Sequence, residues 1–223
     1  SQAQTPVISD FARTQDEQDP LKAFREKFYI PVRPDGSQQI YFTGNSLGLQ
    51  PKTVRSYVEQ ELADWEKFAV EGHMLAKNPW LPYHEFLTEQ MARVIGAKPI
   101  ETVVMNSLTV NLHLLLVSFY RPVGERRKIV IEKGAFPSDQ YAVASQIKFR
   151  GLDPADCLIE LTPREGESTL RTADIIETIE REGDSIALIM LGGVNYYTGQ
   201  AFEMREITDA GHKVGAMVGF DLA

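Results

Sequence analysis

Four short segments rich in polar residues follow apolar runs that are typical of buried strands, and their side chains could bind a small ligand together. The segments begin at Asn106, Gly134, Gly192 and Asp221. In an α/β sheet the carboxyl ends of neighbouring strands meet loops and helix N-termini, and ligands bind where these converge. We therefore expect the four segments to line one pocket.

The first segment has the composition of a phosphate site. Ser107 and Thr109 place hydroxyl groups at the start of a predicted helix over residues 108–120, where free backbone N–H groups attract an anion. The same hydroxyls could instead only cap the helix, and the residues by themselves favour that simpler role. The helix is apolar almost all round, which predicts that it is buried.

Phe136 and Asp221 could contact two different parts of a flat, cationic heterocycle. Phe136 stands before a helix that opens with Pro137, Ser138 and Asp139. It either packs on the first helical turn, with Ser138 or Asp139 as the cap, or stacks on a ring. Asp221 ends an apolar strand, and a carboxylate there needs a partner because burying it alone is costly. A protonated pyridine nitrogen is one such partner, and capping a following element is the alternative role.

Ser46 and His73 carry no functional signal of their own. Ser46 lies in a Gly-Asn-Ser turn, and a single histidine such as His73 is more often structural or simply exposed. The other histidines and Cys157 show no metal-ligand spacing, so we expect no metal site.

The elements that must position these residues alternate between strands and helices from residue 101 onward. Strands are predicted over ETVVMN, RKIVIEK, SIALIML and VGAMVGF, and helices over PSDQYAVASQIKF, TADIIETIE and EMREITDAGHK. Nearly continuous Val, Ile and Met indicate strands buried on both faces, which predicts an α/β fold with a mostly parallel sheet covered by helices. The preceding zone is predicted to be helical. Its longest helix should run from Pro51, in the first turn, to about Ala69.

Composition restricts the partners. The 223 residues carry a formal net charge of −8 with a pI near 5.1, which disfavours nucleic acid and anionic membranes as partners. The single Cys157 cannot form an internal disulfide, and no apolar run approaches the ~20 residues that span a bilayer. The first 20 residues lack the features of a signal peptide. We expect a cytoplasmic protein with a loose arm at its start.

Six sequence blocks together resemble the kynureninase family of pyridoxal-5′-phosphate (PLP) enzymes. They are YFTGNSLGLQP, NSLTVNLHLLLVSFY, AFPSDQYA, PREGESTLRTADI, GVNYYTGQAF and VGFDLA, in order over about residues 40–223. The resemblance implies an incomplete fold type I PLP-dependent transferase-like large domain over residues 71–223, preceded by an N-terminal arm and helices over residues 1–70. It also implies a homodimer. The implied reaction is hydrolysis of L-kynurenine or 3-hydroxy-L-kynurenine to an anthranilate and L-alanine, in tryptophan catabolism and NAD biosynthesis.

The resemblance assigns the candidate residues to one cofactor and one substrate. It implies that the start of the 108–120 helix holds the cofactor phosphate, that Phe136 stacks on the pyridine ring and that Asp139 positions the ring substituents. Asp221 is the implied catalytic residue, because it would pair with the pyridinium nitrogen and keep it protonated. Ser46 and His73 would reach the aryl ketone of the substrate. The implied cofactor-binding residues are Leu108, Thr109, Phe136, Pro137, Ser138, Asp139 and Asp221.

Two departures from the family pattern concern Gly192 and the cofactor lysine. The family often has Ser or Thr at the position of Gly192, so a hydroxyl contact from there is lost. The family's Schiff-base lysine belongs to a Tyr-Lys pair beyond GFDLA, and no lysine of this chain has that context. We therefore expect either a fragment or a chain whose C-terminal remainder is a separate chain.

Three alternatives stand beside this interpretation. A related fold type I PLP enzyme, such as a cysteine desulfurase or a class V aminotransferase, shares single blocks such as GNSLG. A non-catalytic assembly fragment is compatible with the absent lysine context. A Rossmann-type dinucleotide binder is disfavoured, because no G-x-G-x-x-G follows any predicted strand.

Overall fold

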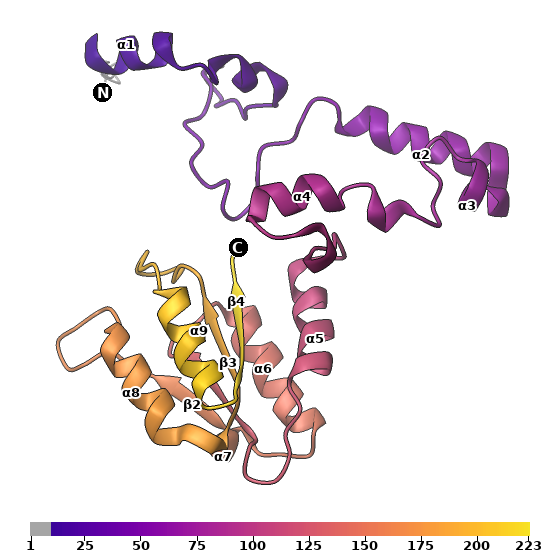
Figure 1. Cartoon of the computed structure of the whole chain (residues 1–223). Helices are drawn as coiled ribbons and strands as arrows, with labels where there is room; N and C mark the ends of the chain where they lie inside the picture. Colours follow the sequence, from indigo (N-terminus) through magenta and orange to yellow (C-terminus); the bar gives the residue numbers. More distant parts are fainter. Residues whose placement is uncertain (1–9) are drawn as a thin grey trace. The chain divides into compact units, whose positions relative to one another are not determined.

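The computed structural model describes residues 10–223, which form two compact units that divide between Val104 and Met105 (Figure 1). The first nine residues of the expected N-terminal arm lie outside the described residues. The boundary expected near residue 70 concerns the domains of a longer protein and stays a prediction.

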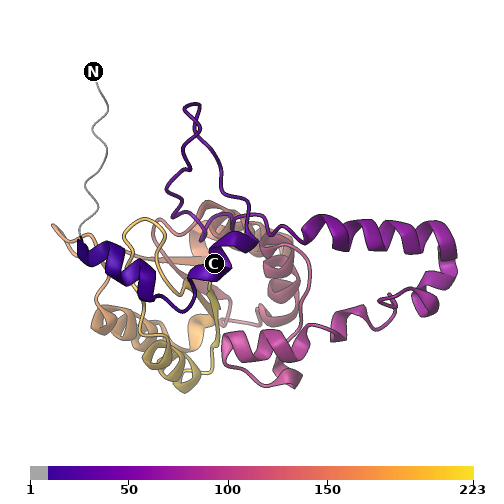
Figure 2. The ribbon, with the colours of Figure 1, turned by 90° about the horizontal axis from the view of Figure 1, so that it is seen from above.

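The first unit consists of helices joined by loops. Its α-helices are α1 (Asp10–Gln18), α2 (Val54–Phe68), α3 (Gly72–Leu75) and α4 (Thr88–Ile95). Short 3₁₀ turns cover Lys22–Lys27, Ala69–Glu71, Tyr83–Glu85 and Pro99–Glu101. Figure 2 shows α2 as the longest helix of this unit, from whose end the chain turns back through α3.

Three expectations for this unit need correction. Helix α1 forms within the stretch that we expected to be loose, although none of its residues is buried. Pro51 does not lie in the first turn of α2: it forms an isolated antiparallel bridge with Phe28, and the helix begins at Val54. The strand predicted over ETVVMN does not form, because the segment has no hydrogen-bonded strand beside it in the described chain.

The second unit is a parallel sheet with helices on both faces. Its strands are β1 (Lys128–Glu132), β2 (Leu158–Leu161), β3 (Ile186–Gly192) and β4 (Met217–Asp221), in the order β2-β1-β3-β4. All three neighbouring pairs are parallel. The predicted α/β class and parallel sheet are therefore confirmed, and β2 is a strand that the sequence reading missed.

Alternate residues of the strands contribute their side chains to two different hydrophobic cores. Ile129 and Ile131 of β1 pack with helices α5 (Leu108–Phe119) and α6 (Pro137–Phe149). Val130, between them, packs on the other face with α8 (Thr172–Glu182) and α9 (Met204–Lys213). This period of two follows from the strand pleat. A short helix, α7 (Pro154–Cys157), leads directly into β2.

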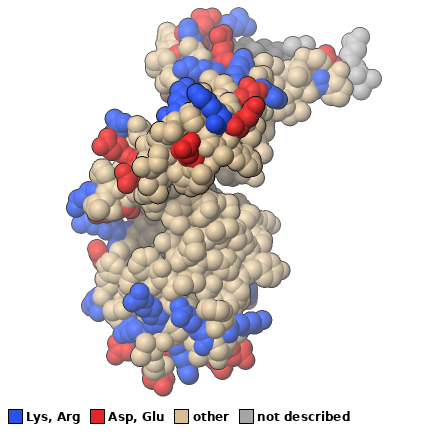
Figure 3. All heavy atoms as spheres, turned by 90° about the vertical axis from the view of Figure 1, so that its right-hand side faces the viewer, with Lys and Arg blue, Asp and Glu red and all other residues tan. Residues whose placement is uncertain are grey.

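Helix α5 departs from its predicted burial. Leu116 is the only fully buried residue within the helix, and one side of it stays open. The exposed apolar side chains of α5 are Leu108, Val110, Leu114, Leu115, Val117 and Phe119. In the space-filling view, which faces the side of the second unit where α5 lies, a broad area is free of charged side chains (Figure 3).

Candidate functional site

Three carboxyl groups gather at the carboxyl edge of the sheet. Glu132 is the last residue of β1, Asp221 is the last residue of β4, and Asp139 lies in the first turn of α6. Glu132 and Asp139 are each only 3% exposed, and Asp221 is half-buried. None of the three forms an ion pair with a Lys, Arg or His within residues 10–223. The edge is therefore negatively charged and suits a cationic group.

Burial and mutual repulsion change how two of these groups titrate. The pKa of Asp139 is raised to about 7, first by burial and then by the nearby Asp221 carboxylate, through its charge and a side-chain hydrogen bond. Burial also raises the pKa of Glu132, with Asp221 adding repulsion, while hydrogen bonds from backbone N–H groups oppose the change. Close to neutral pH, Asp139 can thus hold a proton and donate it to Asp221 in a hydrogen bond.

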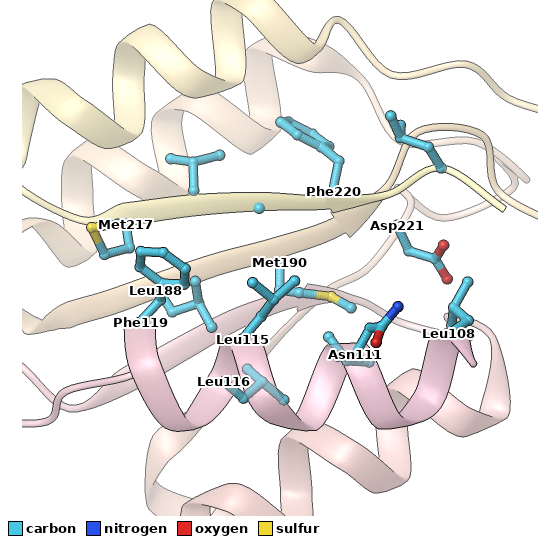
Figure 4. A pocket seen from close by; sticks show the side chains of 14 residues that line it. Leu108, Asn111, Leu115, Leu116, Phe119, Leu188, Met190, Met217, Phe220 and Asp221 are labelled. Atoms are coloured by element: carbon cyan, nitrogen blue, oxygen red, sulfur yellow. The ribbon is translucent and has the colours of Figure 1, made fainter. Parts of the chain in front are cut away.

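Asp221 also stands at one end of an apolar groove of about 730 Å³ between α5 and the strands β3 and β4. In Figure 4 its carboxylate points toward Leu108 and Asn111, in the first turns of α5. The rest of the groove is lined by apolar side chains, including Leu115, Phe119 and Met190. The polar end of the groove therefore coincides with the start of α5.

The start of α5 is compatible with an anion. Ser107 occupies the N-cap position, but its side chain makes no capping hydrogen bond, so the capping role that the residues alone favoured is not realised by Ser107. The Asn111 side chain instead ties down the preceding turn, accepting from the Asn106 N–H at 3.1 Å and donating to the Asn106 carbonyl at 3.3 Å. The sequence reading missed Asn111, which lies inside an otherwise apolar helix.

Phe136 directly precedes α6, and its ring contacts a tyrosine from the loop after β3. It is the N-cap residue, with no side-chain cap from Ser138 or Asp139, and its side chain is 50% exposed. Its ring meets that of Tyr196 edge to face, with centroids 5.2 Å apart. Of the expected cofactor residues, Leu108 and Asp221 line the groove beside α5. Asp139 interacts with Asp221 but does not line the groove, and neither do Phe136 and Thr109.

A second hollow of about 340 Å³ opens on the other side of the β1 end, beside the loop that follows β3. Asn195 holds this loop, because its Oδ1 accepts from the Tyr197 N–H at 3.1 Å, the Thr198 N–H at 3.0 Å and the Thr198 hydroxyl at 3.1 Å. Lys133, directly after β1, also lines the hollow. Nothing in the sequence singled out Lys133 for this position.

Ser46 and His73 belong to the first unit. Ser46 is exposed in a turn, where its N–H donates to the Thr43 carbonyl. The Nδ1 atom of His73 lies 2.8 Å from the Val70 carbonyl oxygen, and its ring packs edge to face on Trp80 with centroids 5.5 Å apart. Since a carbonyl only accepts, Nδ1 is the donor in this contact.

The loop behind His73 is fastened to α2. The Trp80 indole N–H donates to Glu61 at 3.0 Å, and the Lys77 N–H donates to the buried Asp64 at 3.0 Å. Gly72 is needed there, because a Cβ at that position would come within 2.4 Å of the Trp80 ring. The assignment of Ser46 and His73 to the substrate stays a prediction.

Within residues 10–223 no group of three or more His, Cys, Asp and Glu side chains could hold a metal ion. The described helices include none that is long and apolar enough to cross a membrane.

Comparison with known proteins finds kynureninases that are similar to this chain. The chain is 65% identical to the kynureninase of Koribacter versatilis over 97% of its own length, 58% identical to that of Myxococcus xanthus over 96%, and 49% identical to that of Rattus norvegicus over 98%. The chain is a kynureninase homologue. It spans about half the length of the curated relatives that it matches. No family model matches the chain.

Solved structures of other enzymes share the fold of this chain. The cysteine desulfurase CsdA of Escherichia coli superposes with a TM-score of 0.62 at 17% identity, covering 89% of this chain and 47% of the desulfurase. A cysteine desulfurase of Thermococcus onnurineus gives a TM-score of 0.59 at 18% identity, with 95% and 47% covered. The predicted fold type I architecture is confirmed, and at these identities the likeness concerns the fold alone.

Proposed function

We propose that this chain supplies part of the active site of a PLP-dependent kynureninase. The complete enzyme would hydrolyse L-kynurenine, or 3-hydroxy-L-kynurenine, to anthranilate or 3-hydroxyanthranilate and L-alanine. The proposal is supported by the identities of 49–65% to kynureninases. The structural observation that carries it is the contact of Asp139 with Asp221 at the edge of the sheet where α5 begins.

The residues present fit PLP at both of its charged ends. The phosphate would bind at the N-terminus of α5, at Leu108 and Thr109, where the Ser107 side chain does not cap the helix. The pyridinium nitrogen would meet Asp221, in an edge that holds three carboxyls and no ion-paired cation within residues 10–223. Phe136 would lie on the ring, with Pro137, Ser138 and Asp139 on the same helical turn.

PLP, when bound, supplies an electron sink for the negative charge that develops at the substrate α-carbon. The contribution of this chain is electrostatic. The Asp221 carboxylate keeps the ring nitrogen protonated, and an opposite charge in contact typically shifts such a pKa by about 1–3 units. A protonated Asp139 donates a hydrogen bond to Asp221, which holds the Asp221 carboxylate in place.

Ser46 and His73 would bind the aryl ketone of the substrate. The Ser46 hydroxyl can donate to an oxyanion, a type of contact worth about 3 kcal/mol when preorganised. His73 would be a second donor to that oxyanion, through the ring nitrogen that does not contact the Val70 carbonyl.

The complete enzyme needs further polypeptide, and we propose that it packs on α5 and β4. β4 is an edge strand of the described sheet, and the groove beside it is apolar apart from Asn111 and Asp221. The partner would be the remaining part of a kynureninase-length polypeptide, in the same or a separate chain, and two copies of the complete unit would form a homodimer. We place this enzyme in the cytoplasm, in tryptophan catabolism and NAD biosynthesis.

Reconstitution tests this function. The 223-residue chain is produced together with the complementary half of the Koribacter versatilis kynureninase, and PLP is added. We expect a stable complex that releases anthranilate from L-kynurenine, followed by anthranilate fluorescence. The matched control replaces Asp221 by Ala. A complex that binds PLP but acts on L-cysteine and not on kynurenine would overturn the proposal in favour of a cysteine desulfurase. A complex without PLP binding would favour a non-catalytic assembly role.

A further inference from the structure

We propose that Glu132 is a positioning residue of the cofactor site: its buried carboxyl group holds the end of β3 beside Asp221 and sets the charge next to the Asp139–Asp221 pair. The inference deepens the proposed function and rests on the assignment of Asp221 to the cofactor ring. Glu132 itself need not touch the cofactor.

The contact geometry links Glu132 to Asp221 through one strand end. Both carboxyl oxygens of Glu132 lie near the Gly192 N–H, with N···O distances of 3.2 Å to Oε1 and 3.4 Å to Oε2. Gly192 is the register partner of Asp221 in the β3–β4 pair. The next residue, Gly193, donates its N–H to the Asp221 carbonyl at 2.7 Å. Glu132 on β1 therefore fixes the same short segment that β4 uses to place Asp221.

Gly192 is small enough to permit this contact. A Cβ built at Gly192 would lie 3.2 Å from Oε1 of Glu132 and 3.2 Å from the Val194 carbonyl oxygen. Both distances are tighter than ordinary van der Waals contacts, and the Val194 oxygen belongs to the backbone and cannot simply rotate away. A side chain at position 192 would thus push against the Glu132 carboxyl group.

The second part of the role is electrostatic. Glu132 is 3% exposed at the end of a strand that is buried on both sides, so its charge is poorly screened. That charge contributes to the raised pKa of Asp139, after burial and the larger effect of Asp221. The charged and titratable groups near Glu132 are Asp139 from α6, Asp221 from β4, Lys133 after β1, and Tyr196 and Tyr197 from the loop after β3.

Two substitutions separate the contact from the charge. Glu132→Gln keeps an oxygen that can accept from the Gly192 N–H but removes the charge. Glu132→Asp keeps the charge but shortens the side chain by one methylene, so that it no longer reaches Gly192. Glu160→Gln is the matched control, because it removes the same charge from an exposed side chain on the adjacent strand β2.

The first readout is residue-specific NMR on the 223-residue chain without PLP. The Asp139 carboxyl carbon is assigned with Asp139→Asn, and its titration midpoint is compared among variants. We expect Glu132→Gln to lower the midpoint by about half a pH unit or more. In the wild-type chain the NMR signal of the Gly192 amide should shift with pH, because that N–H bonds to the Glu132 carboxyl group. Glu132→Asp should leave the Asp139 midpoint raised but abolish this shift of the Gly192 signal. Glu160→Gln should change neither the midpoint nor the shift. An unchanged midpoint in Glu132→Gln, or an equal change in the control, would overturn the charge role.

The second readout is the equilibrium binding of PLP and of inorganic phosphate at neutral pH. We expect Glu132→Gln and Glu132→Asp each to weaken PLP binding roughly threefold to tenfold, with phosphate binding unchanged, because one pKa unit corresponds to a tenfold factor. If Glu132→Gln does not fold, the Glu132→Asp variant decides. The proposal would be overturned if this variant bound PLP with wild-type affinity and its Gly192 amide signal still shifted with pH as in the wild-type chain. Absence of PLP binding even by the reconstituted complex would defeat the proposed function instead, and the NMR titration would still decide whether Glu132 acts on Asp139.

Discussion

Asp139, in the first turn of α6, lies against Asp221, the last residue of β4, so two carboxyl groups that are far apart in the sequence meet at one edge of the sheet. Two carboxylates in contact repel each other, and burial adds to the cost of charging both. The arrangement is stable when one of them holds a proton or when a cation lies between them and solvent. This relationship gives the site its pH dependence.

Asp139→Asn should therefore change how stability depends on pH. The pKa of Asp139 is raised from 3.8 to about 7 on folding. The folded chain then binds the proton more tightly than the unfolded chain, so stability is lost as pH rises from about 4 toward 7. The Asp139→Asn variant should lack much of this loss and be more stable than wild type above pH 7, by on the order of 2–4 kcal/mol.

Urea unfolding at several pH values between 4 and 8 measures this effect. The pKa of Glu132 is also raised. The free energy of unfolding of the Asp139→Asn variant should therefore still fall as pH rises, but less steeply than in the wild-type chain. The matched control is Asp174→Asn, whose carboxylate is paired with Arg164 and has a lowered pKa. Its contribution to stability is lost only below about pH 4, so this variant should keep the wild-type slope of stability against pH between 4 and 8. If Asp139→Asn kept the full wild-type slope, Asp139 would have to be ionised in the folded chain.

In the reconstituted enzyme, Asp221→Asn should reduce activity far more than it reduces PLP binding. The phosphate contacts at α5 remain, so PLP should stay bound with an affinity within about tenfold of wild type. The ring nitrogen would lose its counter-charge, and kcat for kynurenine should fall by several orders of magnitude. Steady-state kinetics together with PLP quantification check this. Near-wild-type kcat with bound PLP would contradict the assignment of Asp221.

Phe136→Ala should weaken PLP binding without affecting the fold. The half-exposed ring is held by its edge-to-face contact with Tyr196, which leaves a face free for stacking. Offset stacking contributes about 1 kcal/mol, so the dissociation constant of PLP should rise roughly fivefold. Phe149→Ala, at the other end of α6 and more exposed, is the control. Equal PLP affinity in both variants would remove Phe136 from the ring site.

The second unit could largely be predicted from its apolar runs, and the exceptions have physical causes. β1 and β3 are buried and read as Ile, Val and Leu runs. β4 is also an apolar run, although it is an edge strand that stays partly exposed. In contrast, β2 has only four residues and is interrupted by the exposed Glu160. The ETVVMN segment has the composition of a strand, but strand formation depends on a neighbour that composition does not reveal. The outer face of α5 was expected to be buried, and the described residues leave it open.

The candidate site was predicted less completely than the fold. Asp221 was found because an acidic residue ends an apolar run, and Glu132 carries the same signal at the end of β1 but was read only as part of the strand. Asn195 and Tyr196 act through loop geometry, which one sequence does not reveal. The family resemblance is confirmed by the kynureninase homologues, whereas the individual residue roles stay predictions.

The last prediction concerns covalent attachment of the cofactor to lysine. Sodium borohydride fixes PLP to any lysine that forms an imine with it, and peptide mapping then identifies that lysine. We expect no specifically labelled lysine within the 223-residue chain and no kynurenine hydrolysis by the chain alone, because none of its lysines has the Tyr-Lys context of the family. Noncovalent PLP binding should persist, since a helix N-terminus contributes about 1 kcal/mol toward the phosphate.

Lys133 is the lysine most able to contradict this prediction. It directly follows Glu132 and lines the hollow beside Tyr196, so it is the lysine at the end of a strand next to the proposed ring site. The control for adventitious labelling is Lys148, on the solvent side of the last turn of α6. Labelling of Lys133 well above Lys148 that disappears in Phe136→Ala would show that the family's lysine assignment does not transfer to this chain. Equal, weak labelling of both would support the prediction, because only random surface reaction treats the two lysines alike.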